Sequence, residues 1–391
     1  MTSKIHNNLF ERQIEKELIT SASLYPVVTI TGPRQSGKTT VVKKTFPQKV
    51  YINLEEPDTR EKALTDPRAF FRSIPDGGIL DEIQKAPELL SYIQSITDKK
   101  NMKGMFILTG SSNISILHKV TQSLAGRTEI LKLLPMSLFE LQDIMKVKNA
   151  DEIILKGFYP RIYHDNLEPL KAYRNYYETY LERDLRSIIN IKDIRSFQKF
   201  IRLCAGRIGC IFNMNQLANE VGVSSHTINA WCSVLEASYI IFFIQPFYTN
   251  TSKRLIKSTK LYFYDVGLAS YLLGIENITQ LSRDPKRGEL FENMVILEMI
   301  KYRYNQGLDH NLYFYRDSNQ NEVDILYKKG SLFNLIEIKS AETFNKDMLK
   351  GIYRFSHTFP DLVNKKYIIY AGGVSELQGV NIINFWIHIK V

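Results

Sequence analysis

The ten residues Thr31–Thr40, with the sequence TGPRQSGKTT, restrict the fold of this chain more than any other stretch. They follow Val27–Ile30, an apolar run typical of a buried strand, and they lead into a segment with helical character. Gly32 and Gly37 free the backbone to curl its N–H groups around an anion, and the new helix adds unpaired N–H groups and a positive dipole end. A strand, a tight loop and a helix start in this order predict a phosphate-binding loop.

Two side chains at the end of this loop suit the chemistry of a bound nucleotide. We expect the Lys38 amine to reach the β- and γ-phosphates of ATP, and the Thr39 hydroxyl to join the shell of a Mg²⁺ ion. A Gly-rich turn in a basic protein is the alternative, but it predicts neither the preceding strand nor a lysine–hydroxyl pair. The residues expected to bind the nucleotide are Gly32, Pro33, Arg34, Gln35, Ser36, Gly37, Lys38, Thr39 and Thr40.

A second strand-like run, Gly77–Leu80, ends in the adjacent carboxylates Asp81 and Glu82. Charges at the end of a buried strand need a partner, because removing an ion from water is costly, and Mg²⁺ would supply that partner. We expect Asp81 to hold the Mg²⁺ through water, and Glu82 to polarise the water that attacks the γ-phosphate. The alternative, a surface turn after a strand, does not account for the phosphate-binding loop upstream.

Further polar positions border two other predicted strands. The apolar run Met105–Leu108 leads to Thr109 and Ser111, which are placed to sense whether the γ-phosphate is present. Arg127 precedes another predicted strand, Thr128–Leu133, and we expect it to point toward the nucleotide of a neighbouring subunit. A surface salt bridge is the alternative role for this arginine, and the sequence does not choose between the two.

Together these motifs resemble the AAA-type ATPases of bacteria and archaea that carry a C-terminal domain of unknown function. The resemblance rests on the phosphate-binding loop, Ile79–Glu82, Thr109–Ser112, and Gly126–Arg127 followed by Leu134–Glu140. It implies a five-stranded parallel sheet with ATP at the carboxyl ends of its strands, Asp81 and Glu82 as the second nucleotide motif, and a sensor at Thr109 to Ser111. The chain has no clear second-sensor arginine, for which Arg161 and Arg183 are the candidates.

The length of 391 residues exceeds one core of ordinary size, and we expect an α/β protein of three domains. The net charge of +10 and the pI near 9.2 suit a nucleic-acid partner, but such values are also common without one. We find no secretory signal and no run of about eighteen apolar residues, so we expect a cytoplasmic protein with no membrane partner. The expected domains are an ATPase domain (1–145), a helical lid or linker with a winged helix (146–283) and a nuclease-like domain (284–391).

The middle of the chain contains a pattern typical of a helix-turn-helix. Asn213 or Asn215 is placed to cap one helix, and Ser224 to cap a second helix that runs through Ala237. With two strands after it, the segment resembles a winged helix. The side chains expected to face a DNA groove are Ser225, His226, Thr227 and Asn229, and those expected to track phosphates from the wing are Lys253, Arg254 and Lys257. Protein docking is the alternative use of such a fold.

The last part of the chain resembles the core of the PD-(D/E)xK nucleases. A predicted helix carries Glu292, and two later strands carry Asp324 and the sequence Glu337-Ile338-Lys339. Strand alternation places Glu337 and Lys339 on one face, so the carboxylates of Asp324, Glu337 and Glu292 are candidates to hold a second divalent metal ion. Lys339 would orient or deprotonate the attacking water. A hairpin with a solvated charged face is the alternative, and the resemblance implies a fold that has often lost activity.

Two functions remain open from the sequence. In the first, an ATPase couples hydrolysis to DNA binding by the winged helix and to cutting by the C-terminal domain. In the second, a nucleotide-dependent switch binds a partner protein, and its nuclease-like domain is inactive. Assembly into a homo-oligomer fits either function, and an intact Glu82 favours hydrolysis over nucleotide sensing alone.

Overall fold

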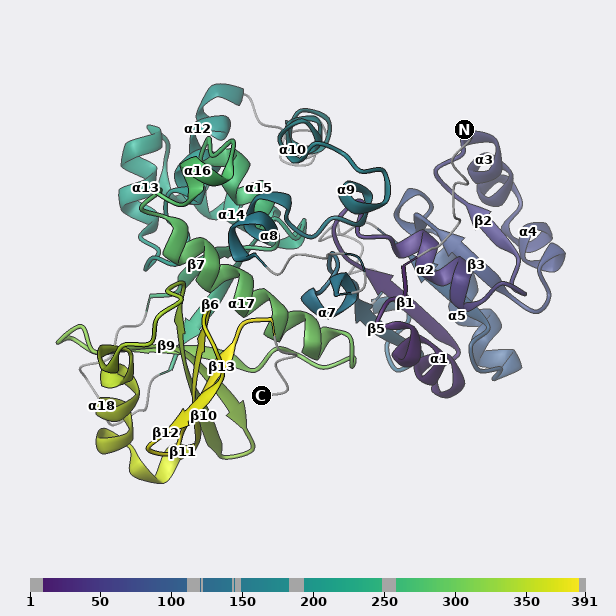
Figure 1. The fold of residues 1–391 in the computed structure, drawn as a ribbon. Coiled ribbons are helices and arrows are strands. Elements are labelled where there is room, and N and C mark those ends of the chain that lie inside the picture. The colour runs from purple at the N-terminus through teal and green to yellow at the C-terminus, as the bar shows by residue number, and fades with distance from the viewer. Residues whose placement is uncertain are drawn as a thin grey trace, which may run out of the picture. The chain divides into compact units, whose positions relative to one another are not determined.

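The computed structural model describes residues 10–110, 120, 122–142, 144, 149–182, 193–247 and 258–386 (Figure 1). These residues group into two compact units, which are described separately. The first unit comprises Met1–Ile144 with Arg303–Leu308, and the second comprises Met145–Tyr302 with Asp309–Val391.

The first unit is built on a parallel five-stranded sheet with the strand order β2-β3-β4-β1-β5. The predicted P-loop type of fold is therefore confirmed, with the strand that precedes the phosphate-binding loop between two neighbours. The strands are β1 (Val27–Thr31), β2 (Tyr51–Asn53), β3 (Gly78–Asp81), β4 (Phe106–Thr109) and β5 (Thr128–Lys132).

Apolar residues cover both faces of this sheet. In β4, Phe106 and Leu108 join one buried cluster and Ile107 joins the other, as the alternation of a strand requires. Because both faces are buried, the strands read as continuous apolar runs rather than as alternating ones. The helices of this unit are α1 (Glu15–Leu24), α2 (Lys38–Thr45), α3 (Pro57–Thr65), α4 (Pro67–Ser73), α5 (Leu89–Lys100) and α7 (Leu138–Leu141), with a 3₁₀ turn at Ile83–Lys85.

The second unit begins with helices, and the predicted helix-turn-helix lies among them. Asn213 caps α13 by accepting a hydrogen bond from Gln216 N at 3.0 Å, and Ser224 caps α14 by accepting one from Thr227 N at 3.1 Å. Gly222, with a φ of 88°, ends α13 in the left-handed conformation. The helices are α8 (Ala150–Lys156), α9 (Pro160–His164), α10 (Pro169–Tyr176) with a π-helical turn (Tyr177–Glu182), α12 (Ile194–Ala205), α13 (Met214–Val221), α14 (Ser225–Ala237), α15 (Val266–Leu272) and α16 (Ile278–Leu281).

One eight-stranded sheet continues through the domain boundary that the sequence predicts at residues 283 and 284. Its order is β12-β13-β11-β10-β9-β8-β6-β7, and the two units of the fold part near residue 145. Strand β6 (Ile241–Pro246) pairs antiparallel with β7 (Lys260–Phe263) and parallel with β8 through Gln245 and Pro246. The remaining elements are α17 (Arg287–Tyr304), β8 (Leu312–Arg316), β9 (Glu322–Lys329), β10 (Leu332–Lys339), α18 (Lys350–Thr358), β11 (Val363–Tyr370), β12 (Ser375–Leu377) and β13 (Val380–Asn384), with 3₁₀ turns at Lys346–Leu349 and Pro360–Leu362.

Candidate functional site

The phosphate-binding loop lies between β1 and α2 and has the backbone of an anion site. Gly32 and Gly37 have φ values of 148° and 92°, and Gln35 between them has a φ of 63°. A Cβ added to Gly32 would lie 2.1 Å from the Leu133 carbonyl oxygen, so no other residue fits there. The first turn of α2 leaves its N–H groups without acceptors inside the helix, and these groups face the same loop.

Lys38 is buried inside this loop, where its partners are neutral. Its Nζ donates to the carbonyl oxygens of Pro33 at 2.7 Å and Gly32 at 3.0 Å. Burial lowers the pKa of Lys38 to about 8, against the opposing effects of Glu82 and Asp81. A phosphate bound in the loop would give this ammonium the negative partner that the two carbonyls do not provide.

Asp81 ends β3 and accepts hydrogen bonds from three hydroxyl groups. Its Oδ2 accepts from Thr39 Oγ1 at 2.9 Å and from Tyr51 Oη at 2.7 Å, and its Oδ1 accepts from Thr109 Oγ1. Thr39 and Asp81, the residues expected to hold Mg²⁺, are thus already in contact, and a hydroxyl with a carboxylate is a donor set that fits this ion. The contact of Tyr51 was not predicted from the sequence, because the pairing of β2 with β3 is set only in the folded sheet.

Glu82 follows Asp81 and has a strained backbone conformation, which turns the chain at the end of β3. Its φ of 56° lies in the left-handed region, which is uncommon for a residue with a side chain. Its N–H donates to Thr109 Oγ1 at 3.4 Å, and Gln84 Nε2 donates to its carboxylate. The tertiary structure therefore turns Glu82 away from the strand direction, and Gln84 holds the carboxylate there.

Arg12 supports the loop, and the sequence analysis did not identify it. Its guanidinium donates to the Ser36 carbonyl oxygen of the loop at 2.8 Å, to the Leu134 carbonyl oxygen at 2.7 Å and to the Glu140 carboxylate at 3.0 Å. Both charged side chains of the pair are almost fully buried, at 4% and 2% exposure. Glu140 belongs to the quoted segment Leu134–Glu140, so the resemblance marked one partner of this ion pair but not the other.

Arg127, the residue predicted to act on a neighbouring nucleotide, does not lie beside the loop of its own unit. Arg127 precedes β5, at the opposite end of the parallel strands from the loop, and its Nε and Nη2 bind the Asp98 carboxylate at 2.5 and 3.0 Å. Its action on a neighbouring subunit stays a prediction. Arg161 pairs with Asp165 in an exposed helix turn, whereas Ser111 and Arg183 lie outside the described residues.

The helix-turn-helix has the division of faces that its pattern predicts. Ile228, Trp231 and Leu235 of α14 are buried. Ser225, His226 and Asn229 are exposed, and Thr227 is half-buried beside the Ser224 cap. The wing residues Lys253, Arg254 and Lys257 lie outside the described residues.

The charged residues predicted for the C-terminal domain do come together. Extending the register in which Ile336 pairs with Ile325 sets Glu337 opposite Asp324. Lys339 Nζ lies 2.7 Å from Glu337 Oε1 and 3.2 Å from Asp324 Oδ2, and the Ile338 N–H donates to the same Asp324 oxygen at 2.8 Å. Burial and the neighbouring Asp324 raise the pKa of Glu337 to about 8, whereas Lys339 opposes that shift.

Glu292, from α17, is bound to the hairpin of β6 and β7, called here the wing hairpin, rather than left open to an ion. Tyr262 Oη donates to Glu292 Oε1, and Lys260 Nζ lies 3.4 Å from the same oxygen. Within the described ranges, no three His, Cys, Asp or Glu side chains are grouped closely enough to hold a metal ion. With Lys260 and Lys339 paired to these oxygens, the cluster does not fit a divalent metal ion as it stands, although Glu337 Oε2 is buried without a hydrogen-bond partner.

Comparison with known proteins defines the class of this chain. Residues 24–142 match the family model described as an AAA domain, residues 147–279 match a domain of unknown function (DUF8612), and residues 287–387 match another (DUF4143). The chain therefore contains an AAA domain followed by a C-terminal DUF4143 domain, which confirms the expected resemblance to proteins with these two parts.

The similar proteins carry little functional description. The chain is 28% identical over 375 residues to the uncharacterized proteins Rv2008c of Mycobacterium tuberculosis and Mb2031c of Mycobacterium bovis, which covers 90% of this chain and 83% of each of those. A solved structure, the Walker-type ATPase paby2304 of Pyrococcus abyssi, matches 68% of this chain and 97% of that chain at 15% identity with a TM-score of 0.43. No helix in the described part of the chain combines the length and apolarity needed to cross a bilayer.

Proposed function

We propose that this chain hydrolyses ATP with the phosphate-binding loop as cradle and Glu82 as the base. The observation that carries the proposal is the contact of Thr39 with Asp81 beside the buried Lys38, because it joins the two nucleotide motifs in one site. Lys38 would bind the β- and γ-phosphates, and Glu82 would take a proton from the attacking water. Thr39 and, through water, Asp81 would hold Mg²⁺, which would offset the charge of the phosphates.

Two substitutions test these roles separately. Lys38→Ala removes the cation of the cradle and is expected to abolish nucleotide binding, as measured with a fluorescent ATP analogue. Glu82→Gln keeps the cradle and is expected to retain binding while turnover falls by about 10²-fold or more, because the base is lost. Equal turnover by the wild type and Glu82→Gln would show that this carboxylate is not the base.

We further propose that nucleotide turnover is coupled to DNA binding by the helix-turn-helix. The exposed Ser225, His226 and Asn229 at the start of α14, together with a net charge of +10, support this partner. Duplex DNA is expected to change the ATPase rate of the wild type and to have less effect on the rate of His226→Ala/Asn229→Ala. If no duplex or single strand binds at low salt, the helix-turn-helix docks a protein, and the alternative of a nucleotide-dependent switch is favoured.

Strand cleavage by the C-terminal domain stays a prediction from the sequence. Asp324, Glu337 and Lys339 are together as a nuclease would need them, but lysine side chains are paired with the oxygens that a metal ion would use. We therefore derive no cleavage step from this cluster. A scaffold that resembles a nuclease and works without a metal ion accounts better for the contacts around Glu292.

A further inference from the structure

Lys260 comes from the wing hairpin yet lies among the acidic residues of the C-terminal cluster. It is the first residue of β7, the strand at the edge of the eight-stranded sheet, and its side chain is only 3% exposed. Its Nζ contacts carboxylate oxygens of Glu292 and Glu322, and it lies 5.5 Å from the centre of the Phe314 ring. A buried ammonium is costly unless it is paired, so this placement needs the carboxylates around it.

The charges around the cluster nearly cancel without any bound ion. The cluster contains four carboxylates, and three cationic side chains contact them. The acidic residues are Glu292, Glu322, Asp324 and Glu337, and the cations are Lys260, Lys339 and Arg316. The four carboxylates and three cations leave the cluster with at most one net negative charge. A divalent ion added to it would meet an ammonium and leave an excess of positive charge.

We propose that Lys260 is the resident cation of this cluster and excludes a divalent metal ion from the nuclease-like site. The wing hairpin thus closes the site with one of its own side chains, and metal binding would require Lys260 to withdraw. Burial acts to lower the pKa of Lys260, but Glu292, Tyr262 and Glu322 outweigh it and raise the pKa above its ordinary value, so the side chain stays charged.

The test is calorimetry with Mn²⁺ on the nucleotide-free full-length chain. The wild type is expected to show no binding at the cluster. Lys260→Met is expected to bind Mn²⁺ with an affinity at least about tenfold above the detection limit for the wild type, because the repelling charge is gone. Lys286→Met is the matched control, since Lys286 pairs with Glu289 outside the cluster. Adding Asp324→Asn to Lys260→Met is expected to remove the new binding.

Each outcome of this experiment decides the proposal. Wild-type Mn²⁺ binding that Asp324→Asn removes would overturn it, and so would a folded Lys260→Met that binds no Mn²⁺. Lys260→Gln, which keeps a hydrogen-bond donor for Glu292, replaces Lys260→Met if that variant does not fold. The ATPase rate, measured on the same samples, is expected to stay unchanged and reports separately on the nucleotide site and on folding.

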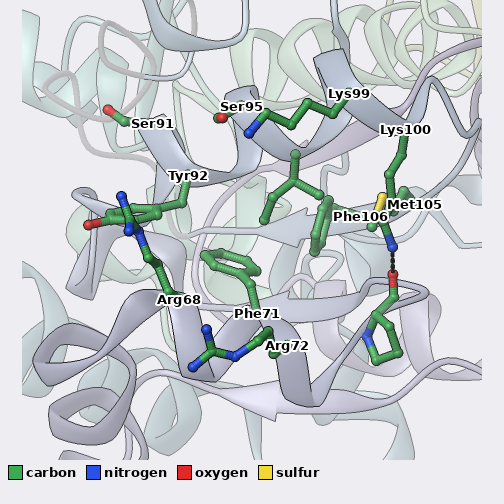
Figure 2. Close-up of a pocket in the computed structure, with 12 residues that line it drawn as sticks. Arg68, Phe71, Arg72, Ser91, Tyr92, Ser95, Lys99, Lys100, Met105 and Phe106 are labelled. Carbon is green, nitrogen blue, oxygen red and sulfur yellow. Dashed lines mark hydrogen bonds between the residues drawn. The ribbon is translucent and has the colours of Figure 1, made fainter.

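A second inference concerns a groove of the first unit, which Figure 2 shows. The groove has a volume of about 890 Å³ and lies between α4 and α5 beside the start of β4, at the end of the strands opposite the phosphate-binding loop. Four cations line it, Arg68 and Arg72 from α4 and Lys99 and Lys100 from α5, and no acidic residue does. Among the described residues, Arg68, Arg72 and Lys99 form no ion pair, whereas Lys100 Nζ donates to the Pro75 carbonyl oxygen at 2.6 Å.

The floor of the groove is apolar, and its rings pack on one another. Phe71 stacks on Tyr92 with ring centres 6.3 Å apart and meets Phe106 edge to face at 5.7 Å. Phe106 and Met105 are fully buried, and Tyr92 is 36% exposed. Nucleic-acid bases stack on exposed ring faces, and only one of these rings is substantially exposed. The accessible apolar surface of the groove belongs to Tyr92, Pro75 and the half-buried Ile96, and such a surface suits apolar side chains better than stacked bases.

We infer that this groove binds an acidic amphipathic segment of a partner protein, with apolar side chains on the floor and carboxylates at the basic rim. Grooves between two helices commonly accept an amphipathic helix in this way. Residues 91, 95 and 99 of α5 lie about one turn apart along the groove. The length of helix between residues 91 and 99 is about 12 Å. That length matches about two turns of a bound helix.

The test uses a labelled synthetic peptide with Leu at positions i, i+3, i+4 and i+7 and Glu elsewhere, followed by fluorescence anisotropy. Arg68→Glu/Arg72→Glu is expected to weaken its binding at least about tenfold, through the loss of complementary charge. Lys62→Glu/Lys103→Glu changes the net charge equally outside the groove and is expected to have little effect. Failure of the peptide to bind, or equal binding by both variants, would overturn the inference. Binding of a labelled single-stranded oligonucleotide that only Arg68→Glu/Arg72→Glu loses would assign the groove to nucleic acid instead.

Discussion

Arg12 shows how one buried side chain can hold a site together. Its guanidinium joins the Ser36 carbonyl of the phosphate-binding loop to the Glu140 carboxylate. A lysine at this position would keep the positive charge but lack the planar set of donors of arginine. At least one of the three acceptors of Arg12 would then stay buried without a hydrogen-bond donor. We expect Arg12→Lys to lower the free energy of unfolding by about 2–4 kcal/mol and to weaken ATP binding, as measured by denaturation and nucleotide titration. A variant with unchanged ATP affinity would show that the loop keeps its shape without Arg12.

Lys38 makes nucleotide binding depend on pH. Because its pKa in the free protein is lowered to about 8, it loses its proton as pH rises through that value, and binding of a phosphate must then take up a proton. We expect ATP affinity to be constant below pH 7 and to fall by up to about tenfold per pH unit above pH 8. Between about pH 8 and the ordinary lysine pKa, the unfolded chain holds a proton on Lys38 that the folded chain has lost. The free energy of unfolding of the nucleotide-free protein is therefore expected to rise with pH over this range. ATP affinity that stays flat from pH 7 to 10 would contradict this assignment.

One buried carboxylate, that of Asp265, links helix α15 to other helices of the second unit. Asp265 caps α15 at Leu268 N, accepts from Phe158 N at 2.8 Å, and accepts from Tyr173 Oη at 2.6 Å. Burial raises the pKa of Asp265, and the three donors oppose that shift. We expect Asp265→Ala to cost about 3 kcal/mol of unfolding free energy and Tyr173→Phe about 1–2 kcal/mol.

Both tryptophans of the chain, Trp231 and Trp386, lie in the second unit, so their fluorescence during denaturation reports on this part. Tyr163→Phe is a useful comparison, since Tyr163 Oη donates to the nearby Gly157 carbonyl, whereas Tyr173 Oη donates to Asp265. A loss for Asp265→Ala no larger than that for Tyr163→Phe would mean that the carboxylate does not fasten the helices.

The charge of the chain is +10, but only cations that lie on DNA phosphates affect the salt dependence of binding. We expect the triple substitution of Lys253, Arg254 and Lys257 by alanine to weaken duplex binding across sequences. It should also reduce the slope of log affinity against log salt by up to about 3, because fewer counterions are released. Lys16, Lys62 and Lys103 changed together to alanine remove the same charge from exposed sites of the first unit and serve as the control. Equal slopes for the two triple variants would rule out the wing as the phosphate contact.

Much of the nucleotide site could be predicted because its parts are short and local. The phosphate-binding loop is one contiguous segment, the carboxylates of Asp81 and Glu82 end one strand, and the caps Asn213 and Ser224 act within three residues. Local hydrogen bonding and the periods of helix and strand act over such distances, so residue order is enough to indicate them. The same periods placed Glu337 and Lys339 on one strand face, where the structure has them.

Contacts between distant segments were settled only in the folded chain. Arg12 and Glu140 are 128 residues apart, Lys260 of β7 reaches Glu292 of α17, and β6 joins β8 across a predicted boundary. The periodicity of apolar residues shows which face of a helix or strand is buried, but it does not show which element covers that face. A single Arg or Lys belongs to no periodic pattern, so its partner cannot be predicted in this way. Lys38, Asp81 and Glu82 belong to short contiguous motifs, so their roles could be predicted from their order in the chain. The partners of Glu292 and Glu140 depended on which elements pack together to bury those charges.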